Sequence, residues 1–266
     1  MVTEHFQLQR MPFERDVPCD SLYRSEQVQQ SLARLLYVSQ QRSMGILTGE
    51  VGAGKSTLLR LLKHHLDPNY YFFVYIADSE LSPRTFYYLV LLQLGVTHPP
   101  FPMAKLKSTF KETVTEYEQN KGMTCVVVID EAQDMTGRMM KELRYVLNFQ
   151  IDSRSPLALI LAGQSELYAH LQNLYLAAVR RRVDAFAYLS GMSLQDTQAY
   201  VGHQLREAGA AHALFPNDVV ERIHEHSKGI LSTINTLCKR SLIDAAGHEQ
   251  KLVEHANLER AAREPY

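Results

Sequence analysis

The residues of this chain best suited to chemistry form a glycine-rich loop that ends in a lysine and a serine. Residues 49–56 have the sequence GEVGAGKS, which fits the spacing G-x-x-x-x-G-K-[ST]. Glycines let successive backbone N–H groups point at one anion, while the lysine adds a cation and the serine a hydroxyl ligand for Mg²⁺. The loop therefore predicts a site for the phosphates of ATP. The residues expected to bind them are Gly49, Glu50, Val51, Gly52, Ala53, Gly54, Lys55, Ser56 and Thr57.

An acidic pair closes a strongly apolar run further along the chain. Residues 125–129 are apolar, and Asp130 and Glu131 follow directly. An apolar strand that ends in two acids is the expected companion of a phosphate-binding loop. Asp130 and Ser56 would then hold Mg²⁺, and Glu131 would orient or deprotonate the attacking water. The two motifs together predict an ATPase, whereas the acidic pair alone also fits a turn or a helix cap.

Two further polar positions are candidates for the same chemistry. Gln164 follows the apolar run 157–162 and could contact the γ-phosphate or the attacking water, or be an amide satisfied within a turn. Residues 180–182 are three adjacent arginines, which fit either a solvated face or an arginine that acts on the ATP of a neighbouring subunit. Arg182 is the preferred finger because it directly precedes an apolar segment, and Arg181 is the second candidate.

The elements that would position these residues alternate between apolar runs and helical patterns. The runs predict buried strands and a parallel sheet with helices between most strands. They lie at residues 44–48, 70–77, 125–131, 157–162 and 183–189. After residue 193 no strand pattern follows, and helices are expected at 194–208, 217–227, 231–246 and 254–264. We therefore expect a leader (1–24) packed on the ATPase core, an α/β nucleotide-binding domain (25–190) and a helical lid domain (191–266).

Composition adds limits on location and partners. The formal net charge is −1, so no overall basic field indicates nucleic acid, and any such contact must come from a local patch. The three cysteines are far apart and form no CxxC pair, which indicates a reducing compartment. Neither a signal peptide nor an apolar run of membrane-spanning length is visible. We therefore expect a cytoplasmic protein that makes no membrane contact.

Several segments together resemble one family of AAA+ ATPases, the ExeA/GspA type, and are similar to the transposition regulators TnsC, TniB and MuB. The resemblance covers about residues 5–245. It rests on Phe6, Pro12-Phe13 and Leu22-Tyr23, on LTGEVGAGKSTLLR (47–60), on IDEAQ (129–133) and on LAGQSEL (161–167). It implies a P-loop NTPase (AAA+) fold, with a parallel five-stranded sheet in the order 5-1-4-3-2, flanking helices and a small all-helical lid. It also implies Gln164 as sensor 1 and ATP bound between neighbouring subunits.

One position departs from that family. Its members usually read Gly-x-Pro-Arg-x-Ile-Asn at the lid helix, where the arginine is sensor 2, but residues 229–235 are GILSTIN. Ser232 cannot place a cation on the γ-phosphate. We therefore expect a lid that senses nucleotide weakly, with either slow hydrolysis or a neighbouring arginine in place of sensor 2.

The resemblance implies two functions of different classes. The first is an ATP-dependent regulator that assembles as a ring or helical filament on double-stranded DNA without sequence preference, recruits or activates a transposase, and disassembles on hydrolysis. The candidate contacts to the DNA phosphates are Arg84, Lys105, Lys107, Lys111, Arg138 and Lys141. Taken singly, each of them is more simply explained as an ordinary surface charge. The alternative is an ATPase of a secretion or envelope-assembly apparatus that acts on proteins. The family's secretion member continues past its ATPase domain whereas this chain ends at the lid, so we favour the first function. A metabolic kinase is disfavoured because no phosphoacceptor pocket is evident.

Overall fold

The chain forms two compact units in a computed structural model that describes residues 2–149 and 155–263. The α/β unit comprises Gln27–Gly49 and Lys55–Leu189, and the helical unit comprises Met1–Glu26, Glu50–Gly54 and Ser190–Tyr266. Residues 1 and 264–266, at the ends of the expected leader and lid domains, lie outside the described residues, as do residues 150–154. Among the described residues, no helix combines the length and apolar composition that crossing a bilayer requires.

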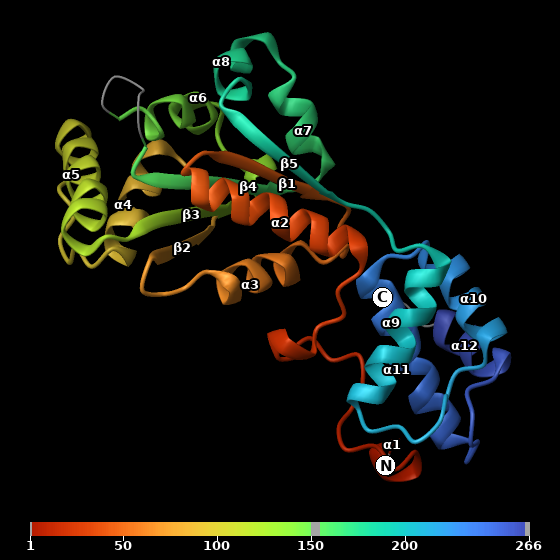
Figure 1. Cartoon of the computed structure of the whole chain (residues 1–266). Coiled ribbons are helices and arrows are strands. Elements are labelled where there is room, and N and C mark those ends of the chain that lie inside the picture. The colour runs from red at the N-terminus through yellow and green to blue at the C-terminus, as the bar shows by residue number, and fades with distance from the viewer. Residues whose placement is uncertain (1, 150–154, 264–266) are drawn as a thin grey trace. The chain divides into compact units, whose positions relative to one another are not determined.

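A five-stranded parallel sheet forms the centre of the α/β unit, with the strand order β2-β3-β4-β1-β5 (Figure 1). This order confirms the expected 5-1-4-3-2 arrangement. Every residue of β1, β3 and β4 is buried, as expected for continuous apolar runs in a parallel sheet, whereas the edge strand β2 buries only Val74 and Ile76. The strands are β1 (Met44–Gly49), β2 (Tyr71–Ala77), β3 (Thr124–Asp130), β4 (Leu157–Gly163) and β5 (Val183–Leu189).

Helices cover this sheet, and α4 and α6 each begin after a residue whose side chain caps the helix. Ser82 accepts a hydrogen bond from the backbone N–H of Thr85 with Pro83 in the first turn of α4. The Thr136 hydroxyl accepts one from the backbone N–H of Met139 at the start of α6. The helices are α2 (Glu26–Gln41), α3 (Lys55–His65), α4 (Pro83–Gln93), α5 (Met103–Lys121), α6 (Gly137–Val146), α7 (Ser165–Leu171) and α8 (Ala177–Arg180), with short 3-10 turns η2 (Ala132–Asp134) and η4 (Leu174–Leu176).

The helical unit contains no strand among its described residues. The Ser193 hydroxyl accepts from the backbone N–H of Asp196 and donates to the Asp196 carboxylate, so Ser193 caps the start of α9. Its elements are α1 (Val2–His5), η1 (Cys19–Ser21), α9 (Leu194–Glu207), α10 (Asn217–Ser227), α11 (Leu231–Gly247) and α12 (His255–Arg263).

The leader belongs to the core of this helical unit, although we expected it on the ATPase core. Phe13 is only 1% exposed, and its ring lies 6.1 Å from that of Phe215 and 6.3 Å from that of Tyr200. Phe6 and Leu8 are buried in the same cluster. The aromatic partners of the leader lie some 200 positions further along the chain, so its irregular apolar spacing gave no sign of where it would pack.

Candidate active site

The phosphate-binding loop joins β1 to α3, the strand–loop–helix context that the motif requires. Gly52 and Gly54 have φ values of 79° and 102°, a backbone region that side chains other than glycine rarely adopt. At Gly49, a Cβ atom would lie 2.4 Å from the Leu189 carbonyl oxygen, so only glycine lets the end of β1 lie beside the end of β5. The loop therefore has the backbone freedom that phosphate binding needs.

Lys55 opens α3 with its side chain buried in the α/β unit. Its Nζ donates to the Gly49 carbonyl oxygen at 2.9 Å. Burial lowers the pKa of this ammonium, and the carboxylates of Glu131, Asp130 and Glu166 act in the opposite direction. The lysine is thus held at the end of β1, beside the first amides of α3, where a bound phosphate would meet both.

The acidic pair lies at the carboxyl end of β3, as the sequence predicts. Asp130 is buried, and its carboxylate accepts one hydrogen bond from the backbone N–H of Glu131 at 3.0 Å and another from the Tyr75 hydroxyl at 2.6 Å. Burial raises the pKa of Tyr75, and the bond to Asp130 raises it further, so this phenol stays protonated and donates. The buried carboxylate is therefore fixed by two neutral donors.

Glu131 sits at a backbone turn between β3 and η2. Its φ of 52° is in the left-handed region, which is uncommon for a residue other than glycine. Gln133 Nε2 donates to Glu131 Oε2 at 2.8 Å and to Asp134 Oδ2 at 3.0 Å. Sequence reasoning gave no role to Gln133 or Tyr75. The signal available for Gln133 was a glutamine set between two acids, Glu131 and Asp134.

Gln164 is brought to the same edge of the sheet, directly after β4. Its backbone N–H donates to Gln133 Oε1 at 3.0 Å, so the tips of β3 and β4 are joined through one side-chain amide. Gln164 is half-buried and directly precedes α7, and its side chain makes no capping hydrogen bond to that helix. Contact between its side chain and a phosphate stays a prediction.

The three arginines lie at the end of α8 and before β5. Arg180 Nη1 donates to Gln172 Oε1 at 2.8 Å, so this member has a local structural partner. Arg181 is exposed and Arg182 is half-buried. Both stay candidates for a finger that acts on a neighbouring subunit.

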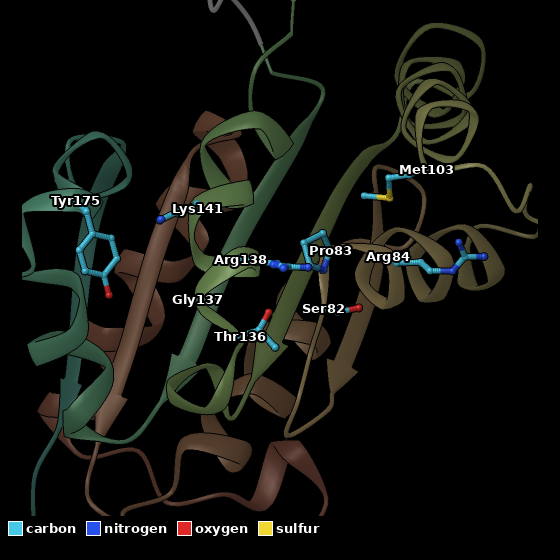
Figure 2. Close-up of a pocket in the computed structure, with 9 residues that line it drawn as sticks. All are labelled: Ser82, Pro83, Arg84, Met103, Thr136, Gly137, Arg138, Lys141 and Tyr175. Atoms are coloured by element: carbon cyan, nitrogen blue, oxygen red, sulfur yellow. The ribbon is translucent and has the colours of Figure 1, made fainter.

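Three of the six predicted DNA contacts line one cavity of 880 Å³ in the α/β unit (Figure 2). They are Arg84 at the start of α4, and Arg138 and Lys141 on α6. Arg84 donates to the Phe101 carbonyl oxygen at 2.8 Å and stacks on its ring at 3.9 Å, while Lys141 lies 5.5 Å from the Tyr175 ring. The other lining residues are Ser82, Pro83, Met103, Thr136, Gly137 and Tyr175.

The remaining three candidates lie on α5 and are not among the residues that line the cavity. Lys107 pairs with Glu142 at 2.5 Å, and Lys111 donates to the Asn148 carbonyl oxygen at 3.1 Å. Both lysines therefore join α5 to the segment that contains α6. Lys105 is exposed on the first turn of α5.

Ser232 packs against the phosphate-binding loop within the helical unit. Its backbone N–H donates to the Gly52 carbonyl oxygen at 3.1 Å, and a Cβ atom on Gly52 would lie 2.0 Å from Ser232 Oγ. The contact requires both a glycine in the loop and a small residue at the start of α11.

Family comparison agrees with this geometry. Residues 38–171, which make up half of the chain and include the loop, the acidic pair and Gln164, match the AAA domain family. This chain belongs to the AAA domain family. It is an AAA ATPase with a parallel five-stranded sheet and a helical C-terminal part.

One relative of this AAA protein is "General secretion pathway protein A" of Aeromonas hydrophila. It is 31% identical over 265 residues, and the match covers 99% of this chain and 48% of that protein. The chain therefore spans about half the length of the relative that it matches. The expectation that favoured a transposition regulator gains nothing from this match, which agrees better with the secretion alternative.

Solved structures show the same AAA+ fold at low sequence identity. Cdc6p of Pyrobaculum aerophilum has a TM-score of 0.73 at 16% identity, covering 94% of this chain and 69% of that one. ORC1 of Aeropyrum pernix in complex with DNA has a TM-score of 0.69 at 13% identity, covering 94% and 67%. The RuvB Holliday junction branch migration motor of Thermotoga maritima has a TM-score of 0.60 at 16% identity, covering 89% and 68%.

Proposed function

We propose that this AAA ATPase hydrolyses ATP in the cytoplasm to drive a secretion or envelope-assembly apparatus through protein partners. The observation that carries the proposal is the match to general secretion pathway protein A, which extends over 99% of this chain and so includes both of its units. Because the chain spans only 48% of that protein, the match does not identify the protein partner of this chain.

The chemistry assigned to the chain follows from the groups at the carboxyl edge of the sheet. The loop amides and Lys55 hold the phosphates. The amide N–H dipoles and the positive charge of Lys55 stabilise the negative charge that develops during phosphoryl transfer. Glu131 accepts a hydrogen bond from the attacking water and aligns it with the phosphorus. The Asp130 carboxylate and the exposed Ser56 hydroxyl are hard oxygen donors that fit Mg²⁺, which, when bound, neutralises phosphate charge.

Replacing Glu131 with glutamine tests this assignment. We expect kcat for ATP hydrolysis to fall about 100-fold or more, because the amide cannot accept a proton from water, while ATP binding is retained. The variant should accumulate in its ATP-bound, assembled state. Steady-state hydrolysis and titration with a fluorescent ATP analogue measure the two effects, and Glu116→Gln on α5 is the matched control. Hydrolysis by Glu131→Gln at the wild-type rate would contradict the role of Glu131.

Oligomerisation belongs to the same proposal. An arginine finger must come from another copy if ATP lies between subunits, and Arg181 and Arg182 are the residues proposed for it. The exposure of Arg181 at the end of α8 supports its availability to a second copy. Hydrolysis would then depend on assembly of a ring or helical filament, and we propose that it is slow because Ser232 stands where a sensor arginine is expected.

A second candidate function is supported by the cavity that Arg84, Arg138 and Lys141 line. Cationic side chains beside the N-termini of α4 and α6 favour phosphate groups. The fold is also shared with an ORC1 protein solved in complex with DNA. In this alternative the ATP-bound oligomer binds double-stranded DNA without sequence preference and recruits a transposase, as the likeness to TnsC, TniB and MuB suggests.

A DNA-binding experiment separates the two functions. The second function predicts ATP-dependent binding that weakens steeply with salt, and reversal of two cations in Arg138→Glu/Lys141→Glu should lower the salt slope by about 2. Lys251→Glu, an exposed lysine of the helical unit, is the control. Binding is measured by fluorescence anisotropy of a labelled duplex with ATP, with ADP and without nucleotide. The secretion function predicts no nucleotide-dependent binding in any of these conditions, and observing such binding would count against it.

A further inference from the structure

We propose that Gln133 is a positioning residue for ATP hydrolysis, which couples the tip of β4 to the carboxylate of Glu131. The inference rests on the proposed role of Glu131 and adds to it the group that holds Glu131 in place. Gln133 itself need not touch ATP or the attacking water, because it acts through Glu131.

The hydrogen bonds of Gln133 use both ends of its amide. Its Nε2 has two hydrogens and two acceptors, Glu131 Oε2 at 2.8 Å and Asp134 Oδ2 at 3.0 Å. Its Oε1 accepts the backbone N–H of Gln164 at 3.0 Å. The residue is 9% exposed, so these bonds form where water competes little. A carboxylic acid or an apolar side chain at position 133 would not provide this combination of two donors and one acceptor.

The backbone around Gln133 is shaped to admit its amide. A Cβ atom on Gly163, the last residue of β4, would lie 2.6 Å from Gln133 Oε1 and 3.3 Å from the Gln133 backbone nitrogen. Any side chain at position 163 would therefore push the amide away. The missing side chain at the end of β4 thus leaves room for the Gln133 amide and for Leu167, whose Cδ2 would lie 3.2 Å from the same Cβ atom.

The amide fixes a side chain that would otherwise have several rotamers. A glutamate loses conformational entropy when it is held in one geometry, and the bond from Gln133 offsets that loss before ATP arrives. A carboxylate has about four acceptor positions, so one donated bond leaves capacity to accept from water. Gln133 therefore orients Glu131 without removing its ability to act on the attacking water.

The same amide connects Glu131 to the residue proposed to sense the γ-phosphate. The Gln164 side chain is the proposed phosphate contact, and the Gln164 backbone N–H is the donor to Gln133. Any shift of the β4 tip that accompanies phosphate contact moves Gln133 Oε1, and with it the Nε2 that holds Glu131. The positions of the sensor and of the water-orienting acid are thus coupled through one side chain.

Gln133→Leu tests the coupling, because leucine keeps most of the buried volume and removes all three hydrogen bonds. We expect kcat to fall about tenfold or more, while KM and the Kd for a fluorescent ATP analogue change less than about twofold. Amide hydrogen exchange at Gln164 should become about tenfold faster, since its N–H loses its acceptor. Gln41→Leu, the same change at the exposed end of α2, is the matched control and should alter neither quantity.

Gly163→Ala provides an independent route to the same result. It leaves Gln133 and both carboxylates in the chain but displaces the amide, so it should lower kcat and speed exchange at Gln164 in the same direction. Thermal unfolding of each variant checks the fold, and Gly163→Ala carries the test if Gln133→Leu does not fold.

The outcomes distinguish this inference from the proposed function. Wild-type kcat in Gln133→Leu, alongside a large loss in Glu131→Gln, overturns the coupling and leaves the role of Glu131 standing. Equal losses of kcat and ATP affinity in Gln133→Leu show a merely structural residue and also overturn it. Wild-type hydrolysis by Glu131→Gln overturns the proposed function itself.

Discussion

Lys55→Ala should abolish ATP binding at concentrations that saturate the wild-type protein, and with it all ATP hydrolysis. The Lys55 ammonium is the cation expected to meet the phosphates at the start of α3, and alanine removes it, so the negative phosphate charge loses this partner. Since charge-assisted hydrogen bonds contribute roughly 1.5–3 kcal/mol each, we expect the affinity for ATP to fall by about 100-fold or more.

The measurement is titration with a fluorescent ATP analogue, followed by steady-state phosphate release. Lys63→Ala, an exposed lysine on the same helix, is the matched control and should bind normally. Lys55→Met separates loss of charge from loss of packing, because methionine keeps the length of the buried stem. An affinity within about threefold of wild type in both Lys55 variants would show that the loop does not bind phosphate through this residue.

The fold was predictable where apolar residues form a continuous run or a regular pattern in the sequence. β1, β3 and β4 are buried on both faces, and strands of that kind read as near-continuous apolar runs. The start of α9 was predictable, since Ser193 can cap the helical pattern that begins at residue 194. Strand order came from the family resemblance, since a run of apolar residues carries no information about its neighbours.

Contacts between distant side chains were not predictable from spacing. Tyr75 lies opposite Val128 in the β2–β3 register, and its hydroxyl reaches Asp130, two residues further along the partner strand. The sequence shows an aromatic strand and an acidic pair, but the pairing register is needed to bring them together. The Gln133–Gln164 bond likewise depends on β3 and β4 being neighbours.

The partners of the basic residues also could not be predicted from the sequence. Lys107 and Lys111 lie four positions apart on one helical face, so both could be taken as candidate phosphate contacts. Their partners, Glu142 and the Asn148 carbonyl, belong to a segment more than 30 positions away that folds against α5. Arg84, Arg138 and Lys141, which come from two segments, line one cavity, and Arg84 also donates to the Phe101 carbonyl oxygen. A basic residue can therefore be assigned as a phosphate contact only after the fold shows which basic residues are already bonded to other parts of the protein.

Arg182→Ala should lower ATP hydrolysis about 1000-fold or more if this residue is the finger, while leaving ATP binding intact. A finger stabilises charge on the transferring phosphoryl group of a neighbouring copy, so its loss affects kcat and not the affinity of the loop. Arg181→Ala is measured in parallel, because both residues are candidates, and Arg180→Ala is the comparison since Arg180 pairs with Gln172.

Mixing variants decides whether the arginine acts between copies. Lys55→Ala keeps both arginines but has no working site, and Arg182→Ala keeps an intact site without the arginine. A mixed oligomer joins an intact site to an intact arginine at some interfaces, so hydrolysis should reappear in the mixture although neither variant hydrolyses alone. Normal hydrolysis by Arg181→Ala and Arg182→Ala would remove both residues as fingers. If the protein stays a monomer when saturated with a non-hydrolysable ATP analogue, with and without duplex DNA, no residue can act between copies, and oligomer-dependent hydrolysis is excluded.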